Sequence, residues 1–289
     1  KKYLIKVISS KIDINRFYNT HNEYEILNDL IDLSKPDKSI PTIFIWPEGM
    51  LTSTNLKDIH YYKDLFQLNF SNKHIIILGI NDVKKDSNLK IYNSLAIVDN
   101  NLNILNYYHK NNLVPFGEFL PMENLLRRIG LKTITNNYQS FSKGRERKII
   151  NIKNQNFDLS FLPLICYEII YSGKLKKTNN FDFIINISED GWFGNSIGPR
   201  QHFAHSIFRA VEEGKNIIRS TNNGISAYID SKGNIIDKIE STQSGVLEIR
   251  NFKNNKETFF SKNGNNIFFY FLLFYITLIF FLKINREIK

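Results

Sequence analysis

Three reactive side chains come directly after short apolar runs of the sequence. Glu48 follows the stretch IFIWP, Lys110 follows a run that ends in YYH, and Cys166 follows LSFLPLI. Such runs are typical of buried strands, and ligands of α/β sheets bind in the crevice beyond the carboxyl ends of the strands. We therefore expect the glutamate, the lysine and the cysteine to lie near one site.

A glutamate, a lysine and a cysteine together suit amide or ester acyl transfer through a thioester. A thiol with a pKa near 8.5 is only a few per cent ionised at pH 7, so it needs a base and a cation to become a good nucleophile. Glu48 is the candidate base and Lys110 the candidate cation. The same ammonium could donate to the oxyanion of the tetrahedral intermediate, where one donor is typically worth about 3 kcal/mol.

Each of these residues, taken alone, also has an ordinary interpretation. A free cysteine is most often a buried small hydrophobe, and a lysine or glutamate after a strand usually faces solvent. Glu118 is harder to explain in this way, because it stands among the apolar residues of VPFGEFLP and a buried carboxylate needs a partner. The combination of residues, rather than any one of them, favours a catalytic site.

Competing chemistries have weaker support. Cys166 is the only cysteine of the 289 residues, which excludes an internal disulfide and a cysteine-rich metal site. His202 and His205 are three residues apart, but the sequence contains neither an HExxH spacing nor an evident third ligand. We expect no metal and no other cofactor.

The apolar patterns predict the elements that position these residues. The candidate strands are Leu4–Ile8, Thr42–Trp46, His74–Ile80, Ile91–Val98, Leu159–Ile165, Phe183–Ile187, Asn216–Arg219 and Ile225–Ile229, and the candidate helices are Glu23–Leu33, Asn55–Phe66 and Gln201–Glu213. Strands interleaved with helices indicate an α/β fold. Pairing of Ile91–Val98 with Leu102–Tyr108 across a short turn predicts a hairpin and hence a mixed sheet. Asn-rich stretches around 136–145 and 172–180 are typical of loops, and a helix is expected to begin near Cys166, where its dipole would stabilise a thiolate.

The C-terminal stretch IFFYFLLFYITLIFFL, residues 267–282, contains no charged side chain. Its length as a helix is roughly 24 Å, slightly less than the ~30 Å of a hydrocarbon core. A buried core helix is the alternative, but a helix that is apolar on every side needs lipid or a large protein interior. We predict a catalytic domain over 1–250, a linker over 251–266, a transmembrane helix over 267–282 and a polar tail over 283–289.

The formal net charge of +10 suits a partner with an anionic surface, either nucleic acid or phospholipid headgroups. No basic helix, zinc-knuckle spacing or RNA-binding signature is present, so we predict a membrane and no nucleic acid. Arg127, Arg128, Arg145, Arg147 and Lys148 could meet phosphate, although a solvated basic face is favoured. The chain opens on Lys1-Lys2 without an initiator Met or a signal peptide, and we expect it to begin inside a larger protein.

Four segments resemble the bacterial apolipoprotein N-acyltransferase family, a membrane-bound branch of the nitrilase (carbon-nitrogen hydrolase) superfamily. They are WPEGM, YHKNNLVPFGEFLP, ICYEI and NISEDGWFGNSIGPRQHFAHSIFRAVEEGKNIIRSTNNGISAYID. The likeness runs from about Leu4 to Ile249 in the order of the family. It implies an α-β-β-α sandwich. Family members carry several transmembrane helices before the catalytic domain, and this sequence departs from them there.

The resemblance also implies roles for single residues. Glu48 corresponds to the general base, Lys110 to the oxyanion-stabilising lysine and Cys166 to the nucleophile. The supporting active-site residues that it implies are Glu118, Tyr167 and Glu168, and the residues of a mobile loop over the lipid entrance are Trp192 and Phe193. From the residues alone, an aromatic pair flanked by two glycines could equally anchor the core.

The reaction that the resemblance implies has two halves. The cysteine takes a fatty acyl group from the sn-1 ester of a phospholipid, and the thioester passes it to the α-amine of the N-terminal diacylglyceryl-cysteine of an apolipoprotein. The family places this chemistry in the bacterial inner membrane, with the catalytic domain facing the periplasm. Two alternatives remain, a nitrilase-type amidase acting on a small amide and a non-catalytic membrane-anchored binding module.

Overall fold

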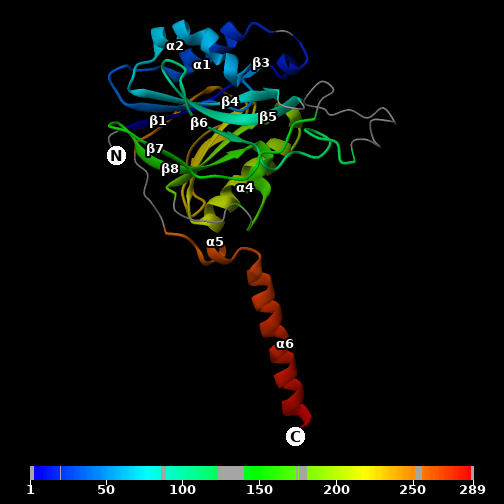
Figure 1. The fold of residues 1–289 in the computed structure, drawn as a ribbon. Helices are drawn as coiled ribbons and strands as arrows, with labels where there is room; N and C mark the ends of the chain where they lie inside the picture. Colours follow the sequence, from blue (N-terminus) through cyan, green and yellow to red (C-terminus); the bar gives the residue numbers. More distant parts are fainter. Residues whose placement is uncertain are drawn as a thin grey trace.

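The computed structural model describes residues 3–19, 21–85, 89–122, 140–173, 175, 181–250 and 256–287, which form two β-sheets packed face to face (Figure 1). The first sheet has the strand order β13-β1-β2-β4-β5-β6, with β3 paired to β4, and the second has the order β12-β11-β10-β9-β8-β7. The strands of the first sheet are β1 (Leu4–Ser9), β2 (Thr42–Ile45), β3 (Leu51–Asn55), β4 (His74–Lys85), β5 (Leu89–Asp99), β6 (Ile104–His109) and β13 (Gly245–Ile249). Those of the second are β7 (Ile150–Lys153), β8 (Asp158–Ile165), β9 (Phe183–Glu189), β10 (Asn216–Asn222), β11 (Ser226–Ile229) and β12 (Ile235–Ile239).

Helices cover the outer face of each sheet. The α-helices are α1 (Glu23–Ser34), α2 (Lys63–Asn69), α4 (Gly198–Glu213), α5 (Phe259–Asn263) and α6 (Asn266–Glu287), and the 3₁₀ turns are η1 (Ile14–Phe17), η2 (Leu56–Tyr62), η4 (Cys166–Ile170) and η5 (Gly191–Phe193). Figure 1 shows α1 and α2 on the first sheet and α4 on the far side of the second. The implied α-β-β-α sandwich is therefore confirmed.

The strands alternate their side chains between two apolar layers. Ile43 and Ile45 of β2 lie in the core between the sheets, whereas Phe44 lies in the core under α1 and α2. Ile184 of β9 packs instead in the cluster that contains Phe203 of α4. This two-residue period is what a sheet that is buried on both faces requires.

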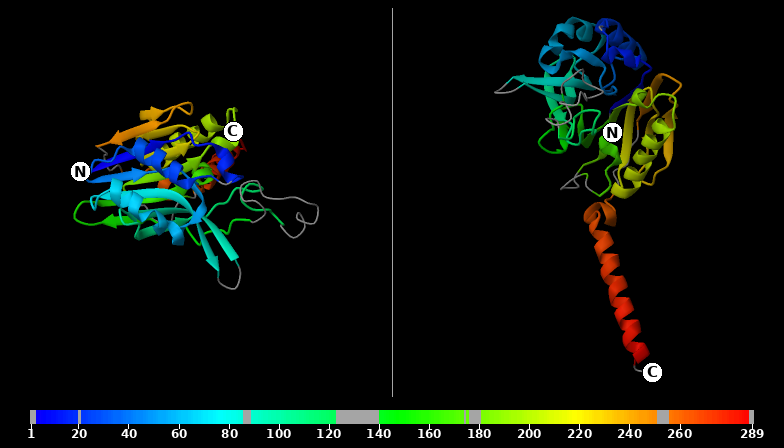
Figure 2. Two further views of the ribbon diagram at one scale, coloured as in Figure 1. Left: turned by 90° about the horizontal axis from the view of Figure 1, so that it is seen from above. Right: turned by 90° about the vertical axis from the view of Figure 1, so that its right-hand side faces the viewer.

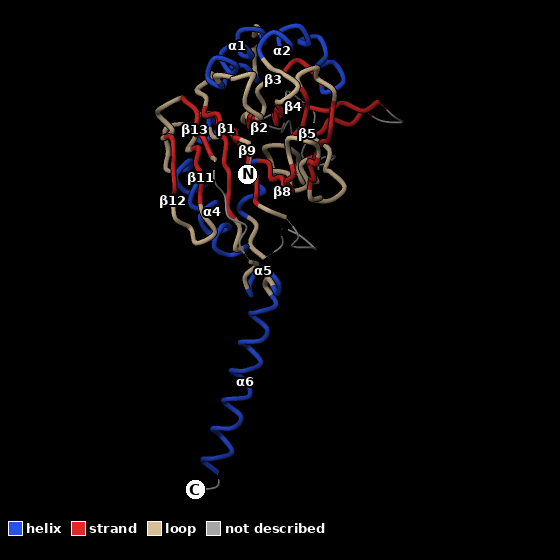
Figure 3. Tube along the Cα trace, turned by 90° about the vertical axis from the view of Figure 1, so that its left-hand side faces the viewer, coloured by secondary structure: helices blue, strands red, loops and turns tan. Residues whose placement is uncertain are grey.

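Both sheets are mixed, as the predicted hairpin indicated. β1, β2 and β4 are parallel neighbours in the first sheet, and β8, β9 and β10 are parallel neighbours in the second. β5 and β6 form the antiparallel hairpin. Figure 3 shows β1 and β13 beside β11 and β12, where the two sheets meet. The carboxyl ends of the central parallel strands thus open toward the same edge of the sandwich.

One predicted helix divides into two elements in the structure. The sequence predicted a single helix over Asn55–Phe66, and the structure has η2 followed by α2. Leu56, Ile59 and Tyr62 are buried in η2, so the apolar residues recur every three positions, which suits a 3₁₀ turn rather than an α-helix.

The C-terminal helix α6 projects away from the two-sheet body (Figures 1 and 2). Its segment Asn266–Lys283 has a mean hydropathy of 1.9, and none of it is buried in the rest of the structure. The buried-core-helix alternative is therefore wrong. A helix of 22 residues is about 33 Å long, which is enough to cross a bilayer by length and composition.

The short helix α5 contacts both α4 and α6. It lies within the segment that the sequence predicted as a linker. Thr258 caps α5, and the Ser261 hydroxyl donates to a carboxylate oxygen of Glu213 at 2.8 Å. Gly264 packs so closely on Gly173 that an added Cβ would approach the Gly173 carbonyl oxygen to 2.6 Å. Residues 251–255 of this segment lie outside the described residues.

Candidate active site

Glu48 lies in a tight turn three residues after the end of β2. Its carboxylate is buried and accepts hydrogen bonds from the Asn93 amide at 2.7 Å and from the Glu189 backbone N–H at 2.9 Å. Gly79 of β4 makes this turn possible, because an added Cβ there would approach the Glu48 Cα to 2.6 Å. The carboxylate is thus fixed at the edge of the sandwich by both sheets.

Lys110 is the first residue after β6, and its side chain is 1% exposed. Its Nζ lies 2.9 Å from Oε1 of Glu118 and 3.4 Å from Oε1 of Glu48. Burial alone would lower the pKa of this lysine, but the carboxylates of Glu118 and Glu48 outweigh it and raise the pKa. The ammonium therefore stays charged in the interior.

Glu118 completes a cluster of two carboxylates and one ammonium. Its Oε2 accepts the Val114 backbone N–H at 2.9 Å, and its Oε1 accepts both Lys110 and the Asn93 amide, the latter at 2.9 Å. Asn93 and Lys110 thus donate to the same oxygen of each carboxylate, since both also contact Oε1 of Glu48. Two carboxylates share one ammonium, so the cluster can accept a proton without becoming positively charged.

Cys166 follows β8 and adopts a left-handed backbone with a φ of 48°. Burial raises the pKa of its thiol, as does the negative charge of Glu48, whereas Lys110 opposes the rise. The expected stabilisation of a thiolate by a helix dipole was wrong, because η4 is a 3₁₀ turn of five residues and no α-helix begins there. The resting group is a thiol, and its ionisation needs a neighbouring base.

Glu168 contacts the backbone just before the cysteine. Its Oε2 accepts the Ile165 backbone N–H at 2.9 Å, and its Oε1 accepts the Tyr108 hydroxyl at 2.8 Å and the Asn111 backbone N–H at 2.9 Å. Arg147 lies 3.7 Å from the same carboxylate. Glu168 therefore ties the turn that carries the cysteine to the segment that follows the lysine.

Of the five basic residues predicted to form a solvated face, Arg147 does not belong there. Its side chain is 7% exposed, and its Nη2 donates to the side-chain oxygen of Asn112 at 2.7 Å. The buried carboxylate of Glu168 explains why a guanidinium is drawn inward at this position. Arg127 and Arg128 lie outside the described residues.

The aromatic residues take different places. Trp192 lines the same pocket as Glu48 and packs against Phe17 at a tilt, with ring centroids 4.8 Å apart and an interplanar angle of 44°. Phe193 is 39% exposed and packs edge-on against His202. Tyr167 is half-buried against another tyrosine, and burial raises the pKa of its hydroxyl. The structure thus brings one member of the predicted loop, Trp192, to the carboxylates.

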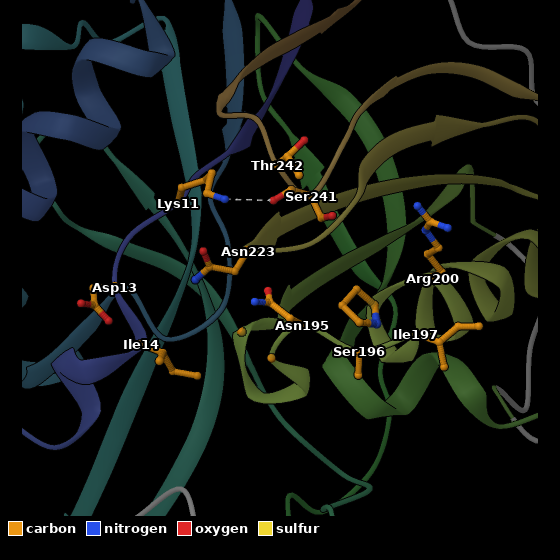
Figure 4. A pocket seen from close by; sticks show the side chains of 13 residues that line it. Lys11, Asp13, Ile14, Asn195, Ser196, Ile197, Arg200, Asn223, Ser241 and Thr242 are labelled. Atoms are coloured by element: carbon orange, nitrogen blue, oxygen red, sulfur yellow. Dashed lines mark hydrogen bonds between the residues drawn. The ribbon is translucent and has the colours of Figure 1, made fainter.

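Two pockets lie on either side of the turn η5. The smaller has a volume of about 190 Å³ and is lined by Phe17, Glu48, Gly49, Leu51, Thr52, Asn81, Asn93, Glu118, Phe141, Glu189 and Trp192. The larger, of about 790 Å³, includes Lys11, Asp13 and Arg200 (Figure 4), and Lys11 donates to the Ser241 carbonyl at its rim at 3.3 Å. Of these two pockets, the smaller is the one lined by Glu48 and Glu118, so it is the candidate active site; Lys110 and Cys166 are not among its lining residues.

The sequence reasoning missed Asn93, the amide that bridges both carboxylates. It also missed the buried cluster formed by Asp190, Arg219 and His202, which contacts the Cys166 backbone carbonyl through His202. Arg219 lies 2.8 Å from Asp190, and His202 Nδ1 lies 2.9 Å from the other oxygen of that carboxylate. Burial would raise the pKa of Asp190, but the Arg219 guanidinium lowers it to about 2. Asn93 and Arg219 are polar residues inside the strands β5 and β10, and this was the only signal for either group.

Among the described residues, no group of three or more His, Cys, Asp or Glu side chains is arranged to hold a metal ion.

The chain belongs to the carbon-nitrogen hydrolase family, whose model matches residues 43–250. The solved structures that it resembles include an amidase from Nesterenkonia sp. AN1, with a TM-score of 0.58, 10% identity and coverage of 86% of this chain and 92% of the amidase. Another is a glutamine-dependent NAD+ synthetase from Acinetobacter baumannii, with a TM-score of 0.60, 16% identity and coverage of 86% and 45%. At such identities these structures support the fold alone.

Curated relatives indicate which branch of this family the chain resembles. An apolipoprotein N-acyltransferase of Wigglesworthia glossinidia brevipalpis is 32% identical over 295 residues, which cover 99% of this chain and 57% of the relative. That of Rickettsia prowazekii (strain Madrid E) is 35% identical over 258 residues, or 86% of this chain and 51% of the relative. The resemblance to this branch is confirmed. The chain spans about half the length of these relatives.

Proposed function

We propose that this chain carries the catalytic site of a lipoprotein N-acyltransferase. The observation that carries the proposal is the buried cluster of Glu48, Lys110 and Glu118 beside the only thiol of the chain. The names of the curated relatives support an apolipoprotein as acyl acceptor. As substrates we propose a phospholipid acyl donor and a diacylglyceryl-apolipoprotein acceptor. We assign Glu48 as general base, Lys110 as oxyanion stabiliser and Cys166 as nucleophile.

In the first half-reaction, Glu48 takes the proton of the Cys166 thiol and the sulfur attacks the ester carbonyl carbon of the phospholipid. The ammonium of Lys110 stabilises the oxyanion of the tetrahedral intermediate, since it remains charged and is already in place. The carbon–oxygen bond to glycerol then breaks, and the departing alkoxide receives the proton from Glu48. A lysophospholipid leaves, and the acyl group remains on sulfur as a thioester.

In the second half-reaction, the neutral α-amine of the acceptor attacks the thioester carbonyl carbon. Glu48 takes a proton from the attacking nitrogen, the carbon–sulfur bond breaks, and the proton passes to the departing thiolate. The products are an amide and the free thiol, so the site returns to its starting state. Exclusion of water matters here, because hydrolysis would discharge the thioester.

The membrane assignment rests on α6 and the family. We propose that residues 1–250 form the catalytic domain, 251–266 the linker, 267–282 the transmembrane helix and 283–289 a polar tail. We place the domain on the periplasmic side of the bacterial inner membrane and assign Trp192 and Phe193 to the substrate entrance. The position of Trp192 on the wall of the pocket supports this role. We assign Glu118, Tyr167 and Glu168 to support of the site.

One observation favours a second candidate, a nitrilase-type amidase acting on a small amide. The candidate pocket has a volume of only about 190 Å³ and is lined in large part by polar side chains, which suits a small polar substrate. A non-catalytic binding module is the weakest candidate, because such a module has no chemical need for a buried base, ammonium and thiol together.

The mass of the intact protein tests the proposal. The chain in vesicles of phosphatidylethanolamine, without acceptor, should gain the mass of one acyl group, and neutral hydroxylamine should remove it. Cys166→Ala should show no gain. Absence of the adduct in a folded wild-type chain, together with release of ammonia from small amides, would establish the amidase instead.

A further inference from the structure

His202 lies against the backbone of the nucleophile. It is on the buried face of α4, which covers the outer face of the second sheet (Figure 3). Its Nε2 lies 3.2 Å from the backbone carbonyl oxygen of Cys166. This imidazole takes no part in the two proposed half-reactions.

The imidazole is itself held from the other side. Its Nδ1 lies 2.9 Å from Asp190, and that carboxylate also accepts the Ser188 hydroxyl at 2.7 Å and Arg219 at 2.8 Å. Gly224 leaves the space for this group, since an added Cβ would come within 2.3 Å of a carboxylate oxygen of Asp190. The histidine therefore has little freedom to turn.

The backbone of Cys166 needs support, because a φ of 48° is unfavourable for any residue with a side chain. Two buried side chains hold the backbone on either side of it. Glu168 accepts the backbone N–H of Ile165 before the cysteine, and His202 contacts the carbonyl of the cysteine itself. Both contacts lie next to the strained residue, so each can hold it in the left-handed conformation.

We propose that His202 is a positioning residue for the nucleophile, which donates its Nε2 hydrogen to the Cys166 carbonyl and so holds the thiol toward Glu48 and Lys110. The carbonyl can only accept, so Nε2 must carry a hydrogen. Nδ1 then either accepts from Nη2 of Arg219, which lies 3.1 Å away, or carries a second hydrogen and donates to Asp190. Because the peptide group is planar and trans, a fixed carbonyl also fixes the Tyr167 N–H, which points the opposite way. The role in acyl transfer rests on the proposed function, whereas the role in holding the thiol does not.

A pair of substitutions of similar size separates donation from packing. Both His202→Gln and His202→Met fill the space with a flexible chain, but only glutamine carries an N–H that can reach the carbonyl. His205, one turn further along α4, is half-buried and packs near Phe208. His205→Gln and His205→Met therefore provide matched controls on the same helix.

Two readouts should be measured on the whole chain in phosphatidylethanolamine vesicles, namely kcat and KM for acyl transfer and the rate at which iodoacetamide alkylates Cys166. We expect His202→Met to lower kcat by about 30-fold with KM changed less than twofold, because the thiol is misplaced while the substrate pocket is intact. Alkylation should slow by about fivefold or more. His202→Gln should stay within about threefold of wild type in both readouts, and the His205 variants should match wild type.

Equal kcat and equal alkylation in His202→Met and wild type would overturn the proposal, as would equal losses in His202→Gln and His202→Met. Should His202→Met not fold, His202→Asn replaces it, because its amide is one methylene too short to reach the carbonyl; equal rates for Asn and Gln then count against the proposal. If the wild-type chain transfers no acyl group, the proposed function fails, and alkylation alone decides whether His202 positions the thiol.

Discussion

Glu48 and Glu189 are two buried carboxylates with very different surroundings. They come from opposite sheets and touch through the Glu189 backbone N–H, which donates to Glu48 at 2.9 Å. Glu189 has a cation of its own, Arg16, and also accepts the Asn222 amide and the Gly191 backbone N–H, each at 2.7 Å. Glu48 has no cation of its own among the described residues, because it shares Lys110 with Glu118.

The difference shows what makes a buried carboxylate reactive. Arginine does not lose its proton in proteins, so Glu189 is permanently paired and its oxygens are occupied. Burial raises the pKa of Glu189, while Arg16 and Asn222 partly offset the rise. Glu48 belongs to a cluster with one carboxylate in excess, and a proton taken from the thiol leaves the total charge of the site unchanged. The number of cations per carboxylate, rather than depth of burial, distinguishes the two.

The substitution Glu48→Gln should have the largest effect on this comparison. The amide keeps the size of the side chain but cannot accept the thiol proton, so acyl transfer should fall by about 10³-fold. The melting temperature should change little, because the substitution removes the negative charge that is in excess. Thioester formation followed by intact mass measures the first effect and thermal unfolding the second. A glutamine variant within tenfold of wild type would remove Glu48 as the base.

The substitution Arg16→Met acts on Glu189, and it should lower the stability of the fold. It leaves Glu189 buried without its cation, and breaking a buried pair in this way costs about 3 kcal/mol or more. Urea unfolding in detergent measures the loss. Lys84→Met is the matched control, because its pair with Asp82 is 3.6 Å long and Lys84 is 35% exposed, so its loss should be below about 1 kcal/mol. Equal costs for the two variants would contradict this account.

Acid should reveal a second carboxylate that, like Glu189, is paired with an arginine. The pKa of Asp190 is lowered from 3.8 to about 2, chiefly by Arg219 acting against burial. The native state thus binds fewer protons than the unfolded state, so the contribution is complete above about pH 4 and is lost between about pH 4 and pH 2. It should amount to about 2 kcal/mol.

Asp190→Asn should lack this part of the acid dependence. Urea midpoints between pH 5 and pH 2 compare the two chains, and the difference between them should shrink as the pH falls. A difference that stays constant over this range would show that Asp190 titrates alike in both states.

The smallest effect concerns the neutral amides that contact each carboxylate. Asn93→Ala removes the neutral donor that Glu48 and Glu118 share in addition to Lys110, and kcat should fall about tenfold, or ~1.4 kcal/mol, as each carboxylate loses one hydrogen bond. Asn222→Ala removes a donor from Glu189 and should lower the melting temperature while kcat is retained. Loss of activity in the second variant and not in the first would reverse the assignment of the two carboxylates.

The sequence predicted the central strands well because they are apolar on both faces. β2, β8 and β9 are buried along most of their length, and such runs are visible without any structure. β12 was missed because its residues are largely exposed, so no alternation marks it as a strand. Its pairing with β11 depends on a neighbour, which a local pattern does not contain.

The residues of the candidate site also fall into two classes, those that a local sequence pattern predicts and those that it does not. Glu48, Lys110 and Cys166 each follow a visible apolar run, so their chemistry could be inferred from local context. The pairing of Arg16 with Glu189 joins residues 173 positions apart, and no local pattern links them. Asn93 sits inside a predicted strand, where the sequence alone does not reveal that its side chain faces two carboxylates.

The joint between α5 and α6 has a mechanical consequence. Only Gly264 and Asn265 separate the two helices, and both lie against Ser172 and Gly173, a few residues beyond the nucleophile turn. A connection with so few free backbone torsions is rigid, so it holds the orientation of α6 relative to the catalytic domain and does not act as a flexible linker. With α6 in a bilayer, substrates that diffuse in the plane of the membrane would meet a site whose tilt relative to the membrane is already fixed. The orientational entropy of the catalytic domain is then lost once, on folding, rather than at each encounter with a substrate.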